Sequence, residues 1–477
     1  MLTKNKKQWM TRQVWHWLSV LLLLIPAQNV SADKLVRPAV MSPLAVSDWT
    51  RYQGNLNHAE NIGVVAVSTD VWWGMVEKNG DQQFDWSYYD QLSDTIIKAG
   101  LKWVPILSFH QCGGNVGDDC NIPIPDWVWE NIAPGQSLSL KYKSELGNYN
   151  SEVISLWSDA QAKAQYVEFI QAFAEHFASK AQYMDEINIS AGTAGELRYP
   201  AYNSHDHWRY PGRGYLQAYN DNAIADFQTY VQQKYQTLAQ VNAAWNSSLE
   251  NWTQITPPMD YGGTQAFFDR QDYLNSNYGK DFVLWYNEAL LRHGDFMLSL
   301  AHETLTGNYR NIPLGVKVPG IHWLIGSPET PRAAEVTTGL ISTDVNLNSD
   351  ADVHGYARLF DRLKQIGERF DGRPLVVHFT CLEMNNDNVA PQYSLPKDLV
   401  FWIGKGAHDR GIPLMGENAL SGGIGNDNGW NNIGNAFQYS SYQGLTVLRV
   451  NNLNDNDQLG FERYQQLIQN FTPETIQ

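Results

Sequence analysis

The sequence predicts an α/β protein folded as a (β/α)8 TIM barrel. Eight short apolar runs are spread along the chain, longer stretches of helical periodicity separate most of them, and no second module follows the last run. The clearest expected helices are 86–99, 161–180, 281–304 and 354–369. The expected strands are 38–44, 63–69, 103–109, 183–190, 314–318, 375–380, 412–416 and 444–450.

Two segments are too long to be simple connections between a strand and a helix. We expect residues 111–160 and 197–280 to be loop insertions at the C-terminal face of the strands, where barrels of this kind build their active sites. Residues 33–477 are then a single catalytic domain. The glycine- and asparagine-rich segment 421–435 is expected to be a loop within it.

Residues 1–32 have the features of a secretory signal peptide. Four cations within the first twelve positions precede the apolar run 15–25, which is too short to span a bilayer. The small residues of "VSA" at 30–32 suit cleavage near Ala32. We therefore expect a secreted protein, extracellular or periplasmic, with no membrane partner.

The charge of the chain limits its partners. The formal net charge is −16, and removing the four leader cations makes it −20. A surface this acidic repels the phosphates of nucleic acid and favours a neutral ligand. The 18 tryptophans and 24 tyrosines offer flat apolar faces on which sugars stack. We expect a monomer that binds a neutral substrate and no nucleic acid.

The three cysteines are interpreted in the light of export. Cys112 and Cys120 lie eight positions apart in the glycine-rich stretch "HQCGGNVGDDC", so an oxidising compartment should allow a disulfide between them. Cys381 is left over and is expected to pack as a buried apolar residue.

Polar residues follow, or end, most of the predicted strands, and in a barrel these positions face one mouth. Each also has a structural explanation. Asp70 could cap a helix, His110 could be a core histidine, Thr380 could be an ordinary strand residue, and Lys317 and Arg449 could neutralise carboxylates. The residues at these positions are Asp70, His110, Glu196, Lys317, Thr380, Glu417 and Arg449.

Glu196 and Glu417 are the strongest catalytic candidates. Each follows an apolar strand beside a glycine, in "AGELRYP" and "MGENAL", and burying a carboxylate without a task is costly. Two carboxylates across one mouth can break a glycosidic bond, one as acid and one as base. The sequence contains no His-Glu-x-x-His zinc motif, Walker loop, dinucleotide fingerprint or Gly-x-Ser-x-Gly elbow.

Several longer motifs resemble those of the β-amylases, in order from about residue 37 to about residue 460. The resemblance implies an exo-acting, inverting glycoside hydrolase that cleaves α-1,4-glucosidic bonds of starch from the non-reducing end and releases β-maltose. Glu196 would be its general acid and Glu417 its general base, with no cofactor required for catalysis. The motifs are "STDVWWGMVEKNGDQQFDWSYY" (68–89), "HQCGGNVGDDCNIPIPDWV" (110–128), "AGELRYPAY" (194–202), "YGKDFVLWY" (278–286), "KVPGIHW" (317–323), "FTCLEM" (379–384) and "GENAL" (416–420).

The resemblance also implies roles for other residues. Loop 113–119 would be a mobile lid that closes Asp118 over sugar, and Thr380 would lie on an inner loop that shifts on binding. Further residues would hold sugar hydroxyls or orient the catalytic pair, namely Asp70, His110, Lys317, His322, Asn418 and Arg449.

A structural calcium ion of the kind found in bacterial members is also implied, on Glu77, Asp81, Gln82 and Glu168. Position 165 is glutamine where an acid is expected, which should weaken the binding of a hard cation. The chain ends too soon after the eighth strand for a starch-binding module, so we expect poor activity on raw granules.

Two alternatives to this hypothesis stay open at this point. A retaining barrel glycosidase also uses two carboxylates at strand ends, and their spacing in the sequence does not exclude it. For an inverting pair we expect carboxyl groups about 6.5–9.5 Å apart, which leaves room for a water. A glucan-binding protein that has lost turnover would keep the pocket, although it would have no need for an acid and a base.

Overall fold

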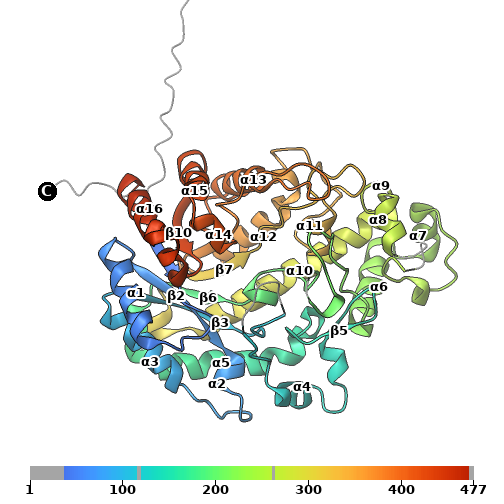
Figure 1. Cartoon of the computed structure of the whole chain (residues 1–477). Helices are drawn as coiled ribbons and strands as arrows, with labels where there is room; N and C mark the ends of the chain where they lie inside the picture. Colours follow the sequence, from blue (N-terminus) through green and yellow to red (C-terminus); the bar gives the residue numbers. More distant parts are fainter. Residues whose placement is uncertain (1–36, 115–119, 203, 260–263, 472–477) are drawn as a thin grey trace, which may run out of the picture. The chain divides into compact units, whose positions relative to one another are not determined.

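A closed barrel of eight parallel strands forms the centre of the computed structural model (Figure 1), which describes residues 37–114, 120–202, 204–259 and 264–471. Around the barrel the strands follow the order β1, β10, β9, β8, β7, β6, β3, β2. Each strand overlaps one of the eight predicted runs, so the predicted fold class is confirmed. The strands are β1 (Arg37–Met41), β2 (Ala66–Trp72), β3 (Lys102–Ser108), β6 (Ile187–Ile189), β7 (Leu314–Val318), β8 (Leu375–Phe379), β9 (Leu414–Glu417) and β10 (Tyr442–Val447).

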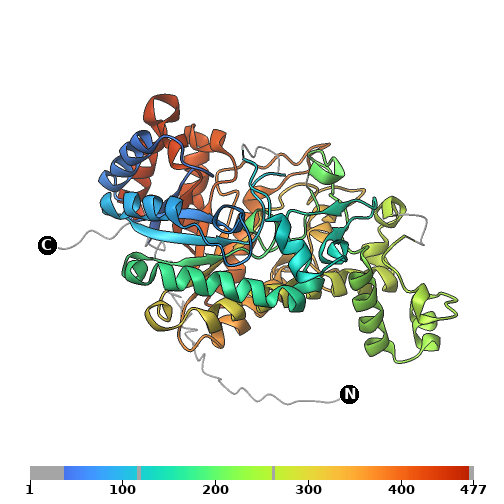
Figure 2. The ribbon, with the colours of Figure 1, turned by 90° about the horizontal axis from the view of Figure 1, so that it is seen from below.

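Helices surround the strands in both ribbon views (Figures 1 and 2). The four clearest predicted helices correspond to α3, α5, α10 and α12, with ends displaced by up to four residues. The helices are α1 (Trp49–Asn61), α2 (Trp73–Val76), α3 (Ser87–Lys98), α4 (Asp126–Ile132), α5 (Asp159–His176), α6 (Asp221–Tyr235), α7 (Leu238–Trp245), α8 (Thr264–Asp269), α9 (Asp272–Asn275), α10 (Asn277–Thr304), α11 (Ala333–Thr337), α12 (Ala357–Glu368), α13 (Pro396–His408), α14 (Ser421–Ile424), α15 (Asp427–Tyr439) and α16 (Asp455–Phe471).

The strands are buried because the ring of helices covers them. Every residue of β7, β8 and β9 is buried, which agrees with near-continuous apolar runs in a parallel sheet. The polar exceptions in these strands are Lys317, His378 and Glu417. Within the described ranges, no helix is both long enough and apolar enough to cross a membrane.

Both predicted insertions are present and have structure of their own. Segment 111–160 contains α4 and an antiparallel pair, β4 (Tyr142–Lys143) with β5 (Tyr149–Asn150). Segment 197–280 contains α6 to α9 and the start of α10. Asp281 of α10 ties this second insertion down, because it accepts hydrogen bonds from Lys234 Nζ (2.5 Å), Tyr235 Oη (2.5 Å) and Trp245 Nε1 (2.8 Å).

The prediction of a loop at 421–435 is wrong, because this segment forms α14 and most of α15. The side chain of Asn426 caps α15 by accepting a hydrogen bond from the Gly429 amide. Trp430, Ile433 and Phe437 then bury one face of the helix. This apolar spacing outweighs the glycines and asparagines that suggested a loop.

The described residues, from 37 to 471, form one compact unit by their internal contacts. The signal peptide expected at 1–32 lies outside the described residues, and so does Asp118 of the expected lid.

Candidate active site

The two candidate catalytic glutamates come from opposite parts of the sequence and are both linked to Lys317. Glu417 is the last residue of β9, and its Oε1 accepts a 2.5 Å hydrogen bond from Lys317 Nζ of β7. Glu196 follows β6, and its backbone forms a parallel bridge with Lys317. The Leu197 amide donates to the Lys317 carbonyl at 2.8 Å. One lysine therefore holds the backbone at one glutamate and the carboxylate of the other.

A tight turn positions Glu196 after β6. Gly192 has φ +156°, and a Cβ there would lie 2.5 Å from the Glu196 carbonyl oxygen. Gly195 has φ +77° and faces the ring of His110, which a Cβ would meet at 3.1 Å. Both positions therefore require glycine for backbone conformation and space. This requirement explains the glycines that surround the glutamate in the sequence.

The Glu196 carboxyl is set between an arginine and a tyrosine. Arg198 Nε donates to Oε2 at 2.7 Å, and Tyr202 Oη donates to the same oxygen at 3.5 Å. Burial raises the pKa of Glu196, the positive charges of Arg198 and Lys317 oppose this, and the negative charge of Glu417 adds to it. The net result is a raised pKa, which favours the protonated form.

The environment of Glu417 shifts its pKa the other way. Burial again raises the pKa, but the Lys317 ammonium and His378 outweigh it and lower the pKa to about 2. Both side chains lie close to Oε1, Lys317 Nζ at 2.5 Å and His378 Nδ1 at 3.3 Å. In the described part of the chain, no hydrogen bond or ion pair engages Oε2. The site therefore offers one carboxyl suited to donating a proton and one suited to accepting it.

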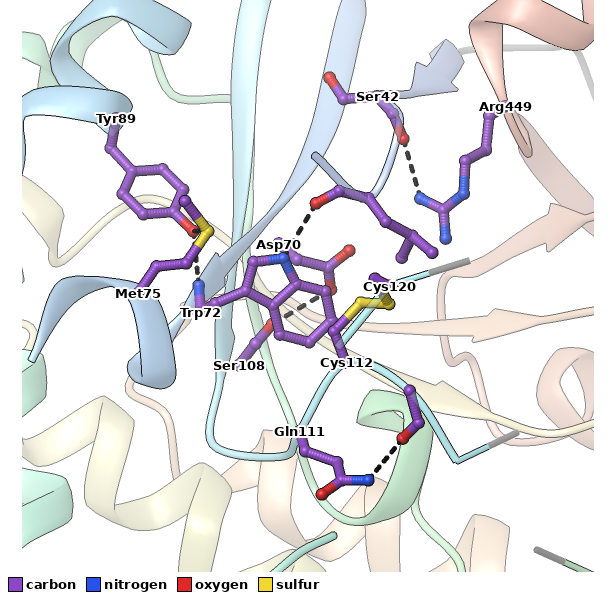
Figure 3. The surroundings of a disulfide bond; sticks show 12 residues. Ser42, Asp70, Trp72, Met75, Tyr89, Ser108, Gln111, Cys112, Cys120 and Arg449 are labelled. Atoms are coloured by element: carbon purple, nitrogen blue, oxygen red, sulfur yellow. Dashed lines mark hydrogen bonds between the residues drawn. A yellow bond between two sulfur atoms is a disulfide. The ribbon is translucent and has the colours of Figure 1, made fainter. Parts of the chain in front are cut away.

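Asp70 and Arg449 lie near this pair and close to the disulfide (Figure 3). Asp70 is within β2 rather than beyond it, and its Oδ1 accepts from Ser108 Oγ at 3.1 Å. Burial raises the pKa of Asp70, while Arg449 and Lys317 lower it. Arg449 was expected within the strand 444–450 but lies beyond the end of β10, and its Nη1 donates to the Ser42 carbonyl at 2.8 Å.

His110 and His322 are buried and neutral at physiological pH. Burial, together with Arg198 and Lys317, lowers the pKa of His110 to about 3. Burial lowers the pKa of His322 to about 4. Nδ1 of His110 hydrogen bonds to Ser190 Oγ at 2.8 Å, and Nδ1 of His322 bonds to Ser394 Oγ at 2.7 Å. Neutral imidazoles in such places can donate or accept hydrogen bonds to an uncharged ligand.

Asn418 and Thr380 occupy neighbouring strand ends. The Asn418 side chain is buried. Its Nδ2 donates to the Leu448 carbonyl, and its Oδ1 accepts from the Leu448 amide, each at 2.8 Å. Asn418 therefore fixes the chain immediately before Arg449. Thr380 directly follows β8 and remains partly exposed.

Comparison with known proteins identifies the family. Residues 39–475 match the family model described as "Glycosyl hydrolase family 14". The chain belongs to glycosyl hydrolase family 14. It is 40% identical to the thermophilic beta-amylase of Thermoanaerobacterium thermosulfurigenes, over 91% of this chain and 75% of that protein. It is also 40% identical to a beta-amylase of Cytobacillus firmus, over 88% of this chain and 84% of the relative.

A solved structure extends this similarity to the fold. The catalytic domain of the beta-amylase from Paenibacillus polymyxa is 38% identical, with a TM-score of 0.80, and the match covers 92% of this chain and 99% of that domain. The chain is therefore a glycoside hydrolase of the β-amylase family, and the resemblance predicted from its motifs is confirmed.

The sequence analysis missed two residues next to the pair. His378 of β8 lies between Glu417 and Glu186, with its Nε2 2.5 Å from Glu186 Oε1. Glu186 precedes β6 and is fully buried. Each is an isolated polar residue in an apolar run, "LVVHFT" and "MDEINIS". That contrast was visible in the sequence, but it does not indicate that the two side chains meet.

The residues expected to hold calcium form a cluster beside α2 and α5. One carboxylate oxygen from each of Glu77, Asp81 and Glu168 lies within 4.8 Å of the others. Burial, together with repulsion from Glu168 and Asp81, raises the pKa of Glu77 to about 7 despite hydrogen bonds from Trp73 and Gln82. Within this cluster, Oδ1 of Asp81 is buried without a hydrogen-bond partner. This set of crowded, partly unpaired oxygens fits a hard cation.

Both cysteine predictions are confirmed. Cys112 and Cys120 form a disulfide with Cα atoms 5.6 Å apart (Figure 3), and Cys381 is buried.

Proposed function

We propose that this chain is an exo-acting, inverting hydrolase of α-1,4-glucans that releases β-maltose from the non-reducing ends of starch. The observation that supports this most is the opposite pKa shift of the partly buried Glu196 and the buried Glu417, which are both linked to Lys317. Relatives at 40% identity are beta-amylases, which supports the substrate.

In the proposed reaction Glu196 is the general acid. It gives its proton to the glycosidic oxygen as the bond from that oxygen to the anomeric carbon breaks. Arg198 fixes the carboxyl through Oε2, while burial favours the proton that must be delivered. The leaving sugar departs as a neutral alcohol.

Glu417 is the general base in this proposal. Its Oε2 accepts a proton from a water whose oxygen attacks the anomeric carbon from the opposite face, so the configuration inverts. Lys317 and His378 hold Oε1, which keeps the carboxylate ionised and leaves Oε2 for the water. After product release, Glu417 returns its proton to solvent and Glu196 regains one.

The remaining predicted residues would bind the sugar chain around this pair. Their charged and polar groups would fix the hydroxyls, and the insertions would close one end of the pocket, as exo action requires. The residues proposed for sugar binding are Asp70, His110, Asp118, Lys317, His322, Thr380, Asn418 and Arg449.

We also propose that calcium has a structural role at the cluster beside α2 and α5. Glu77, Asp81 and Glu168 would bind it through carboxylate oxygens, with Gln82 adjacent. The ion would offset the repulsion among these carboxylates. It takes no part in the reaction.

The cationic, apolar leader and the acidic remainder support export of a monomeric single-domain enzyme, residues 33–477, after cleavage near Ala32. Amino-terminal sequencing of the secreted protein tests the cleavage position. A mature protein that begins at Met1 would contradict it.

Two amide variants test the proposed acid and base. Glu196→Gln and Glu417→Gln should each abolish maltose release from soluble starch, since neither amide can transfer the proton, while maltose binding measured by calorimetry persists. Glu288→Gln is a control, because Glu288 forms an ion pair with Arg362 on the outer helices. Full activity in either test variant would overturn the assignment.

A further inference from the structure

A column of ionisable residues runs from Glu417 into the interior of the barrel, defined here as Arg37, Glu186, His378, Glu417 and Lys317. Barrel interiors are usually packed with branched apolar side chains. Here the exposed fractions of the Glu186, His378 and Glu417 side chains are 0%, 3% and 6%. Burial of unpaired charge is costly, so each charge in the column needs a partner.

His378 connects the two carboxylates of this column. Its Nε2 lies 2.5 Å from Glu186 Oε1, and its Nδ1 lies 3.3 Å from Glu417 Oε1, as an ion pair rather than an aligned hydrogen bond. A neutral imidazole would direct a lone pair at one of these oxygens, whereas an imidazolium presents an N–H on both sides. The geometry therefore favours the charged ring.

Other cations also pair with the carboxylates around His378. Arg37 Nη1 pairs with Glu186 Oε2 at 2.5 Å, and Arg37 also pairs with Asp185 at 2.6 Å. Lys317, the strand neighbour of His378, pairs with Glu417. Lys102 Nζ also lies 3.8 Å from Asp185 Oδ1, and a protonated His378 adds a cation between Glu186 and Glu417. Asn188 supports the arrangement by donating to Glu186 Oε1 at 2.9 Å.

We propose that His378, held as an imidazolium by Glu186, is a positioning residue that keeps Glu417 ionised and oriented toward the reacting water. This inference rests on the proposed role of Glu417 as the base. Burial alone would lower the pKa of His378, but Glu186 and Glu417 outweigh it and raise that pKa. His378 acts through Glu417, and its contacts are with carboxylates inside the barrel.

Replacement of His378 by glutamine tests this proposal. His378→Gln removes a positive charge 3.3 Å from Glu417 Oε1, so the acid limb of kcat/KM should move up by about one pH unit. On that limb kcat/KM should fall about tenfold, with a smaller loss at the plateau. Glu186→Gln should shift the limb in the same direction, because His378 loses its anchoring anion.

His293→Gln is the matched control for this substitution. His293 is also buried and paired with a carboxylate, Asp159, at 2.9 Å, but it lies on α10 outside the barrel. The pH profile of kcat/KM for His293→Gln should superpose on that of the parent. If the acid limb of His378→Gln also superposes on that of the parent, the proposal is overturned.

The protonation state of His378 can also be measured directly in the parent protein, so that the test does not depend on the activity of variants that fold poorly. In parent protein labelled with 15N-histidine, the signal lost in His378→Gln should show both ring nitrogens protonated at neutral pH. A neutral ring would overturn the proposal. The Glu417→Gln variant separates failure of the proposed base from failure of the role of His378. Retained activity in Glu417→Gln would overturn the assignment of the base. An inactive Glu417→Gln together with an unshifted His378→Gln profile would overturn only the role of His378.

Discussion

Lys317→Met removes the closest charge to the proposed base and leaves the barrel strand otherwise intact. Lys317 Nζ lies 2.5 Å from Glu417 Oε1, and the exposed fractions of the two side chains are 10% and 6%. Solvent therefore screens the pair little. Methionine retains most of the aliphatic stem and cannot donate to the carboxylate.

The magnitude follows from the pKa of Glu417. An opposite charge this close lowers a carboxyl pKa by about 1–3 units, which is about 1.4–4 kcal/mol. Burial disfavours the ionised form of Glu417, and pairing with Lys317 favours it. Loss of Lys317 should therefore raise the pKa of Glu417 from about 2 toward or above 4.5. A depressed folded-state pKa stabilises the fold above the unfolded value and loses that effect as pH falls from 4.5 to about 2.

Urea unfolding at pH 7 and pH 4 measures this effect, together with the pH dependence of kcat/KM. At pH 7 the variant should lose about 3 kcal/mol, the loss should be smaller at the lower pH, and the acid limb should move upward. Lys405→Met is the control, because Lys405 pairs with Asp409 on an exposed face of α13. It should change stability by less than about 0.5 kcal/mol. An unchanged acid limb in Lys317→Met would refute this reasoning.

Three further predictions follow from other contacts. Arg198→Met removes the cation that opposes protonation of Glu196, so the alkaline limb of kcat/KM should move to higher pH; a downward shift would contradict the role of burial. Calcium at about 100 times its Kd should stabilise the parent by about 2.7 kcal/mol in thermal unfolding, and Glu77→Gln should abolish this gain; equal gains would exclude the cluster. Asp281→Asn should cost about 2–4 kcal/mol in urea unfolding, because Lys234 loses its buried partner; a negligible loss would show that Asp281 is no anchor.

The barrel was predictable because parallel strands covered by helices leave near-continuous apolar runs, as in "LGVKV" of β7, whose bounds match the prediction. The shortest strand, β6, covers only Ile187–Ile189 of the predicted 183–190. The preceding residues instead turn Asp185 and Glu186 toward Arg37. Periodicity does not encode such an ion pair across the barrel.

The two glutamates and Lys317 could be predicted as site residues from their places at or near the ends of predicted strands, because a barrel brings all those ends to one mouth. The side chains that shift the pKa values of Glu196 and Glu417 in opposite directions were harder to predict from the sequence. His378 and Glu186 are 192 positions apart, and only the closed barrel places their side chains in contact. Asn418 was expected among the residues that hold sugar hydroxyls or orient the pair, and its amide bonds the backbone of Leu448.

The configuration of the first product tests the inverting pair most directly. Proton NMR of fresh digests of soluble starch, recorded before mutarotation equilibrates the anomers, should show maltose appearing as the β-anomer from the outset. Maltose that appears first as the α-anomer would mean that Glu196 and Glu417 do not act as an inverting acid and base.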